Sequence, residues 1–140
     1  MAGEFFPEDY QSFPFKEGDL LVSQRSNGMF SVNKILKIDK VTLKAGESIR
    51  IQNQVFQAPV EDHLLVISAS YGESEFKSFE DAKKAAVSGQ WTVKIGHVPN
   101  RDPGAAAGQQ FVGNSPVKES ELNGYYQWKV AFKKGEAGIF

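Results

Sequence analysis

Cysteine is absent from this 140-residue chain, and histidine occurs only twice. Without cysteine there can be no disulfide, no thiolate metal ligand and no cysteine nucleophile. The two histidines, His63 and His97, lie far apart in the sequence, whereas a catalytic zinc ion commonly takes three protein ligands. We therefore predict no metal site, no cofactor and no catalytic residue.

Long hydrophobic runs and an excess of one sign of charge are also missing. No apolar run approaches the roughly 20 residues of a membrane-spanning helix, and the first ten residues lack the basic and apolar regions of a signal peptide. The 16 basic and 17 acidic residues give a net charge of −1, without the basic excess typical of nucleic-acid binding. The sequence thus predicts a cytoplasmic protein with neither a membrane nor a nucleic-acid partner.

One group of lysines tests that conclusion, since lysines among aromatics on a small barrel are typical of single-strand binders. Lys34, Lys37, Lys40 and Lys44 recur through two neighbouring predicted strands. Acidic residues such as Asp39 are interspersed among them. We interpret these lysines as a solvated polar face.

What is present is the composition of one globular domain, covering residues 1–140. Hydrophobic residues make up 41% of the chain and charged residues 24%, which is ordinary usage for a folded protein. The first fifteen residues hold five aromatics, three acids and two prolines. We expect this N-terminal arm to lie extended and to place some of its rings in the core; the alternatives are an arm that docks on a partner and one that mediates homo-oligomerisation.

The first half of the chain reads as successive hairpins. Asn27-Gly28 is a dipeptide typical of hairpin turns, residues 45–47 form a second turn signal, and residues 53–54 a third. A break in the alternation indicates a β-bulge near Asn33-Lys34. The predicted strands cover residues 20–24, 29–39, 41–43, 48–52, 55–56 and 63–71, the last being the most apolar and the candidate central strand.

A helix over residues 79–88 is the clearest local signal. Ser78 can cap its first turn, and Gly89 stands where a left-handed residue ends a helix. Lys83 and Lys84 are expected to face water, and the predicted inward stripe consists of Phe79, Ala82, Ala86 and Val87. A strand over residues 91–98 follows.

Residues 99–140 combine signals for a loop with signals for a C-terminal helix or strand. Residues 99–114, with their prolines, glycines and alanines, predict a long loop, and residues 99–103 a rigid turn within it. Ser115-Pro116 is typical of a helix start, and Leu122, Tyr125, Trp128 and Phe132 recur at helical spacing. Residues 126–132 also alternate, so a strand remains the alternative to a helix over residues 117–134. Ile139 and Phe140 are expected to pack back onto the domain.

These elements predict an α+β fold. We expect a mainly antiparallel, bent sheet or small barrel with one or two packed helices.

Acidic and aromatic residues gather around the predicted start of the helix. Residues 71–81 carry a net charge of −3, with Tyr71 and Phe76 expected to be exposed. Carboxylates among aromatics suit electrostatically steered docking on a protein partner, whereas acids in a first helical turn also complement the helix dipole without any partner. The candidate partner-binding residues are Glu73, Glu75, Phe76, Glu80 and Asp81.

A second cluster of polar residues lies near the predicted end of the strand over residues 91–98. An imidazole, an arginine and the Asp102 carboxylate within six residues could serve a small active site or ligand pocket, bounded by the Trp91 strand and the C-terminal aromatics. Such a pocket predicts a cleft with a shifted His97 titration. Its candidate residues are Trp91, His97, Asn100, Arg101, Tyr125 and Trp128.

The segment Gly18-Asp19-Leu20-Leu21-Val22, followed by Asn27-Gly28, Phe30 and Val32, resembles the opening hairpin of SH3-like barrels, including some small bacterial immunity proteins that neutralise secreted toxins. The resemblance covers about fifteen residues and implies no particular functional residue. It favours a bacterial, non-catalytic interaction protein of immunity or adaptor type. The alternatives are a small-ligand-binding protein or enzyme with its pocket near His97 and Arg101, and a homo-oligomeric structural protein.

Overall fold

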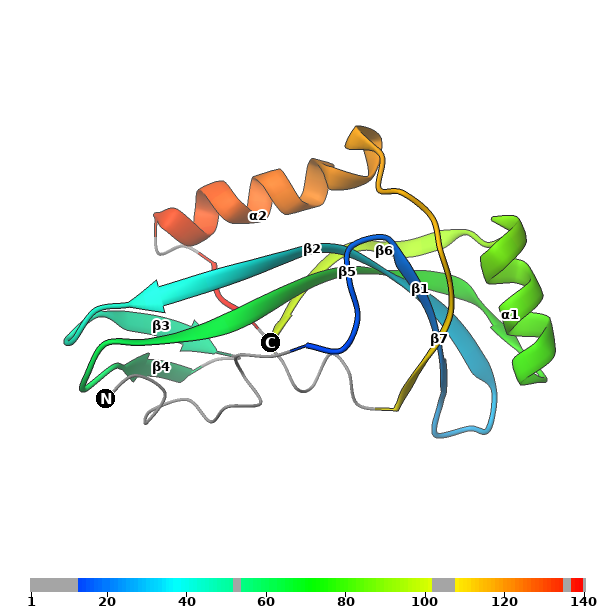
Figure 1. The fold of residues 1–140 in the computed structure, drawn as a ribbon, viewed down its shortest axis with the longest axis horizontal. Helices are drawn as coiled ribbons and strands as arrows, with labels where there is room; N and C mark the ends of the chain where they lie inside the picture. Colours follow the sequence, from blue (N-terminus) through cyan, green and yellow to red (C-terminus); the bar gives the residue numbers. More distant parts are fainter. Residues whose placement is uncertain (1–12, 52–53, 102–107, 135–136, 140) are drawn as a thin grey trace.

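The computed structural model describes residues 13–51, 54–101, 108–134 and 137–139. They form a five-stranded antiparallel sheet, a separate two-stranded hairpin and two α-helices (Figure 1). The predicted α+β class is confirmed, with a bent sheet rather than a closed barrel: in the order β6-β5-β2-β1-β7, β6 and β7 are the two edges of the described sheet. The predicted turn at residues 53–54 falls partly, and the arm at residues 1–12 wholly, outside the described residues.

The sheet consists of β1 (Asp19–Gln24), β2 (Phe30–Leu43), β5 (Asp62–Phe76), β6 (Val93–Arg101) and β7 (Gln109–Asn114). The hairpin pairs β3 (Ser48–Ile51) with β4 (Gln54–Gln57). The helices are α1 (Phe79–Ser88), a single 3-10 turn η2 (Glu119–Leu122) and α2 (Asn123–Lys133). No helix within the described ranges is long and apolar enough to cross a membrane.

The pair β2–β5 forms a ribbon that runs most of the length of the molecule (Figure 1). The two strands predicted at residues 29–39 and 41–43 are one strand, because pairing with β5 continues without interruption from Ile38 to Leu43. The register shifts twice, between Ser31 and Asn33 and between Ile35 and Lys37. Pairing is regular through Asn33, Lys34 and Ile35, so the predicted position of the bulge is wrong: the first irregularity adds residues to β5, and the second adds one residue to β2, at Leu36.

The predicted turns depend on single glycines in the left-handed region. Gly28 has φ +86° and its N–H donates to Arg25 O, while Arg25 N–H donates to Met29 O. This pattern is that of a three-residue hairpin loop with a left-handed glycine, so the turn is one residue longer than a two-residue Asn-Gly loop. Gly46, with φ +88°, makes the turn from β2 to β3.

Helix α1 has the predicted bounds and caps. Ser78 Oγ accepts a hydrogen bond of 3.1 Å from Asp81 N–H, and Gly89 ends the helix with φ +75°. The buried residues are Ala82, Ala85 and Ala86. The predicted inward position of Val87 is wrong, because its side chain is 60% exposed on the outer side of the helix.

The predicted loop over residues 99–114 is also wrong. β6 continues through Pro99 to Arg101, and residues 109–114 form β7, which pairs with β1. Asn100 and Arg101 are therefore strand residues rather than parts of a rigid turn, and His97 lies within β6 rather than at its exit. Proline is tolerated in β6 because this strand is an edge of the sheet.

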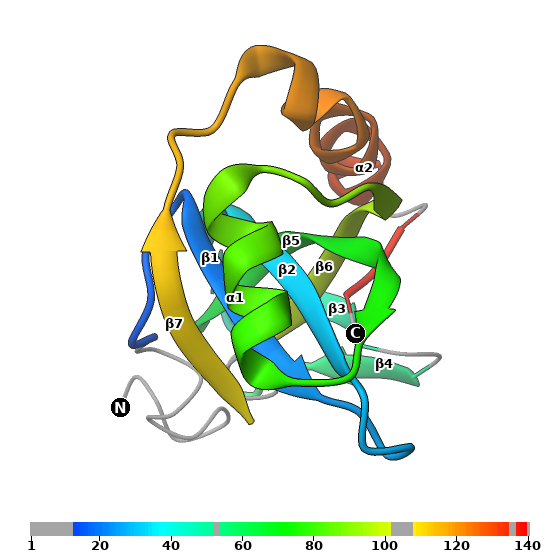
Figure 2. The ribbon, with the colours of Figure 1, turned by 90° about the vertical axis from the view of Figure 1, so that its right-hand side faces the viewer.

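The C-terminal segment is a helix, as predicted, and not a strand, but it begins later than Ser115-Pro116. Ser115 instead extends the sheet region, its N–H donating to Gly18 O. Helix η2 and α2 then place Leu122 and Tyr125 in the core, with Trp128 and Phe132 half-buried. α2 lies along one side of the sheet and α1 at its end (Figures 1 and 2).

Alternation along the strands separates the two faces of the sheet. Leu20 and Val22 pack with α1, whereas Leu21 between them belongs to a cluster on the opposite face. Phe13 and Phe15, in edge-to-face contact with centroids 5.5 Å apart, pack against that second cluster. The expectation that the arm contributes rings to the core is confirmed for these two residues.

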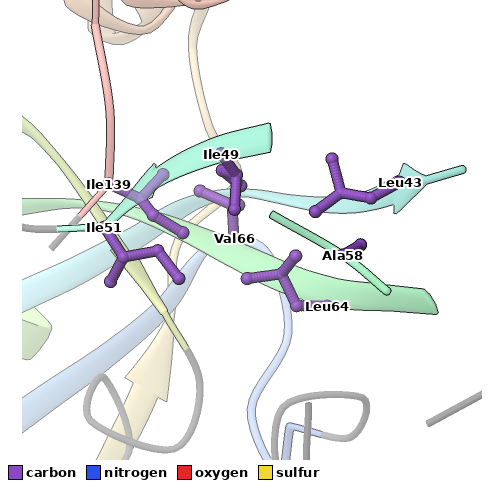
Figure 3. Packing of buried hydrophobic residues seen from close by; sticks show 7 residues of the cluster. All are labelled: Leu43, Ile49, Ile51, Ala58, Leu64, Val66 and Ile139. Atoms are coloured by element: carbon purple, nitrogen blue, oxygen red, sulfur yellow. The ribbon is translucent and has the colours of Figure 1, made fainter. Parts of the chain in front are cut away.

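The far end of the β2–β5 ribbon has its own core, shared with the β3–β4 hairpin. Ile139 lies beside Ile51 and Ile49 (Figure 3) and forms a parallel bridge to Ile51. Ile139 N–H donates to Arg50 O at 3.0 Å. A Cβ on Gly138 would lie 2.6 Å from that same oxygen, so the glycine permits the approach. The expected return of Ile139 is confirmed; Phe140 is outside the described residues.

Gly124 marks the closest approach of α2 to the sheet. A Cβ at this position would lie 2.7 Å from His97 Cβ. Alanine would favour an isolated helix by about 1 kcal/mol, but here we expect Gly124→Ala to destabilise the fold by about 1–2 kcal/mol, because the helix must move off the sheet. Urea unfolding measures this.

Gly96→Ala in β6 is the matched control, because its Cβ would meet no atom within 4 Å. We expect its free energy of unfolding to change by less than about 0.5 kcal/mol. Equal effects of the two substitutions would contradict the close packing of α2 on His97.

Candidate functional site

The five residues predicted to bind a partner lie where β5 runs into α1. Phe30 pairs with Phe76 and Ser31 with Glu75, so the side chains of Glu75 and Phe76 lie on opposite faces of β5. Phe76 is half-buried against the α1 core, and Tyr71 is half-buried on the other face. The expectation that both aromatics are exposed is corrected, since each contributes to a core cluster.

Glu75 holds the tip of the β1–β2 hairpin. Its carboxylate lies 3.5 Å from an Arg25 guanidinium nitrogen and accepts hydrogen bonds of 3.2 and 3.4 Å from the Asn27 amide. Glu73 is exposed, and its N–H donates to Thr92 O. The acidic residues are therefore divided between the hairpin contact and the start of the helix.

Glu80 and Asp81 are exposed in the first turn of α1, where carboxylates complement the helix dipole. They border a shallow groove of about 730 Å³ along the outer side of this helix. Phe76, Ala85 and Val87 contribute its apolar surface, and Lys83 and Lys84 follow one turn after the acids. The groove thus includes Phe76, Glu80 and Asp81 of the predicted set.

Three of the six residues predicted to bind a ligand form one aromatic cluster beneath α2. The His97 ring lies with its centroid 6.0 Å from that of Tyr125 and 5.6 Å from that of Trp128. His97 Nε2 and Ser68 Oγ are 2.9 Å apart, and Ser68 is fully buried. A serine hydroxyl so enclosed is positioned to orient the imidazole, not to attack a substrate.

Burial lowers the pKa of His97 to about 4, and the nearby Asp39 carboxylate opposes this shift only in part. Asp39 is held by two groups of α2, accepting 3.0 Å from Tyr125 Oη and 3.4 Å from Lys129 Nζ. Burial also raises the pKa of Tyr125. A neutral imidazole is therefore part of the contact between α2 and β6.

The other three residues lie elsewhere. Trp91 packs in the α1 core, with its ring against Gly72. Asn100 is on the opposite face of β6 from His97, where its amide donates 2.9 Å to Tyr71 Oη. Arg101 is the last residue of β6. The structure thus brings His97, Tyr125 and Trp128 together and separates them from Trp91 and Asn100.

A buried ion pair that the sequence reasoning missed lies between the two helices. Lys34 is 4% exposed on β2, and its ammonium lies 3.0 Å from both carboxylate oxygens of Glu121 in η2. It also donates, at 3.4 Å, to Pro116 O. The interpretation of this lysine as solvated is corrected; Lys40 and Lys44 are exposed, as predicted.

A cleft adjoins this ion pair on both sides of Glu121. The outer lobe, about 480 Å³, lies between the C-terminal end of α1 and η2 and is lined by Lys34, Trp91 and Ser88 among others. The inner lobe, about 270 Å³, reaches Ser70 and Gly124. Val93, Ser120 and Glu121 line both lobes. We call the two lobes together the interhelical cleft.

Alternation along β2 was the available signal for this site. Val32, Lys34 and Leu36 are at alternate positions of β2, so their side chains are expected on the same, inward face of the strand. A lysine at the middle position therefore requires a buried partner. Glu121 had no comparable signal, because it lies 87 positions further along the chain. Residues predicted from local clusters therefore did not include the pair.

Comparison of the chain with known protein families, with curated proteins and with solved structures finds no match in any of the three.

The titration of His97 gives a prediction about stability. Its pKa is about 4 in the fold against 6.5 in the unfolded chain, so the unfolded chain binds the additional proton between these values. Stability should therefore fall as the pH is lowered from about 6.5 to about 4 and level off below that. Since the ring keeps some contact with solvent, we expect a loss of about 1–2 kcal/mol.

Urea unfolding at several pH values measures this effect in the wild type and in His97→Gln, which should lose most of the slope. His63→Gln, at a half-buried position in β5, is the matched control and should retain it. Identical pH profiles for the wild type and His97→Gln would contradict the assignment.

The ion pair gives a second prediction. Glu121→Gln leaves the buried Lys34 ammonium without its counter-charge, which should cost about 2–3 kcal/mol of stability. The double variant Lys34→Met/Glu121→Gln removes both charges and should recover most of that loss. Thermal and urea unfolding of the three proteins test this; a double variant no more stable than the single one would show that the charge interaction is not the cause.

Proposed function

We propose that the protein is a non-catalytic interaction protein that binds a protein partner along the outer side of α1. The observation that supports this proposal is the groove beside the helix, which combines apolar surface at Phe76, Ala85 and Val87 with charged residues at its rim. Val87 is 60% exposed although it is a large apolar residue. Phe76 is half-buried and Ala85 is buried, so Val87 supplies most of the exposed apolar surface, within a charged rim of the kind that protein partners contact.

The charges along α1 define the kind of segment that fits. Glu80 and Asp81 come first along the helix, and Lys83 and Lys84 follow within one turn. A complementary partner segment presents a basic residue to the first pair, an acidic residue to the second, and an apolar side chain to Val87 one turn further along the helix. The resemblance of the first hairpin to SH3-like barrels and small immunity proteins favours the same class of function.

The arrangement around His97 favours binding over catalysis in this protein. His97 is neutral near pH 7 because burial lowers its pKa to about 4, and its Nε2 is engaged with Ser68 Oγ. A general base needs a pKa nearer the working pH and access to the substrate proton. The imidazole instead packs against Tyr125 and Trp128 of α2, which is a structural role.

Site-specific photocrosslinking tests the proposed surface. The photoreactive residue p-benzoylphenylalanine in place of Lys84, within the groove, should yield a discrete adduct with one protein in lysate of the source cells. Val55, 64% exposed on β4, is the matched control position and should yield none. Equal adducts from both positions, or none from Lys84, would contradict the proposal.

Charge reversal then tests the recognition itself with the purified partner. Glu80→Lys should weaken binding about tenfold or more, because it places like charge opposite the partner's basic residue. Glu61→Lys, at an exposed site outside the groove, should leave the affinity within about twofold. Titration calorimetry measures both; equal losses would indicate an effect of net charge and not of the groove.

A further inference from the structure

The interhelical cleft carries an inference independent of the α1 groove. Its walls come from elements far apart in the sequence: β1 and β2, the last turn of α1, the start of β6, and η2. Volumes of about 480 and 270 Å³ in adjoining lobes are of the size that holds small molecules in proteins. The cleft is therefore large enough for a ligand.

A buried polar group in the inner lobe lacks a partner. Ser70 is 3% exposed and lines this lobe, and its Oγ has no hydrogen-bond partner among the described residues. Ser70 is the cross-strand neighbour of Lys34 in the β2–β5 pairing, so it adjoins the ion pair. Buried hydroxyls are nearly always satisfied in folded proteins, and this one lacks a partner where the chain leaves a cavity.

The Lys34–Glu121 pair of the cleft is already balanced within the chain, and Lys118, which also lines the outer lobe, is exposed to solvent. The Lys34 ammonium has three protons, and three oxygens lie within reach of them, two on Glu121 and one on Pro116. An entering anion would have to displace Glu121, whose Oε1 also accepts from Lys118 N–H at 2.9 Å. A neutral ligand keeps all of these contacts, so the Lys34–Glu121 pair favours a ligand without charge beside it.

Besides Lys118 and Asn123, the groups that remain for recognition are hydroxyls and one indole. Ser88, Ser115 and Ser120 line the outer lobe beside Trp91. Hydroxyls can donate or accept, and therefore match ligand hydroxyls in either sense. The Trp91 ring offers a flat apolar surface of the kind that covers the C–H face of a sugar ring.

We propose that the interhelical cleft binds a neutral polyhydroxylated ligand of the monosaccharide class, with Trp91 covering its ring and Ser70 Oγ, together with the remaining lone pair of Glu121 Oε2, hydrogen-bonding its hydroxyls. The ligand bridges the end of α1 and η2. Binding leaves the Lys34–Glu121 pair intact.

Two-dimensional amide NMR on the full chain tests the proposal. The probes are D-glucose, D-mannose, D-galactose and N-acetyl-D-glucosamine, each titrated alongside the charged analogues D-gluconate and D-glucosamine. At least one neutral sugar should give saturable shifts of the Trp91 indole and of the Ser70 and Ser120 amides. Absence of saturation by every neutral sugar up to 100 mM, or saturation only by charged analogues, would overturn the proposal.

Ser70→Ala separates ligand recognition from folding. The substitution removes a buried hydroxyl that has no partner in the free protein, so the melting temperature should stay the same or rise. The affinity for the sugar should fall about five- to tenfold, because one hydrogen bond is lost. Ser74→Ala, exposed on the same strand, is the matched control and should bind as the wild type does.

An undiminished affinity in Ser70→Ala would remove the inner lobe from the site and refute the assignment. Because neither the probes nor Ser70 belong to the α1 groove, failure here would leave the partner-binding proposal unaffected. Conversely, a Glu80→Lys variant that loses partner binding but retains sugar binding would show that the groove can be disabled without affecting the cleft.

Discussion

The long antiparallel pairing of β2 with β5 is the constraint on which the rest of the structure depends. It runs from Phe30 paired with Phe76 to Leu43 paired with Asp62, and no other pair in the described sheet has comparable length. α1 packs near one end of this ribbon, α2 over its middle, and the β3–β4 hairpin near its other end (Figure 1). The register of these two strands therefore determines which residues each of these elements packs against.

The second irregularity in that register, at Leu36, changes which residues of β2 face α2. On a regular strand, Ile35 and Leu36 would already face opposite sides. Here Ile35 packs with the Phe13–Phe15 side and Leu36 under α2, and beyond the second shift Asp39 again faces α2. Lys34 lies between the two shifts, paired with Leu20 of β1 and Ser70 of β5. A change of register by one residue would exchange these faces and bury the polar groups against the wrong layer.

The sequence predicts this fold best where the determining contact is local. Ser78 and Gly89 define α1, and Gly28 and Gly46 define turns, because each acts within four residues. β6 and β7 were misassigned beyond Val98, since their stability comes from pairing with β5 and β1 at long range and not from composition. Gly124 illustrates the same limit: its helix propensity argues against α2, but the residue is required by the proximity of His97.

The candidate sites follow the same division. The acids of the first helical turn could be located from the sequence, whereas Lys34 with Glu121 required the tertiary fold. The groove and the cleft nevertheless share residues, since Val87 and Ser88 line both. A partner segment seated along the outer side of α1 and a ligand at its C-terminal end would act on the same last turn of the helix. By thermodynamic linkage, if binding of one occupant changes the affinity for the other by some factor, binding of the second changes the affinity for the first by the same factor. The helix is attached to the sheet by Ala82 and Ala86 and by Phe79, whose ring makes an edge-to-face contact with Phe30, so this packing is the structure through which the two occupants would influence one another.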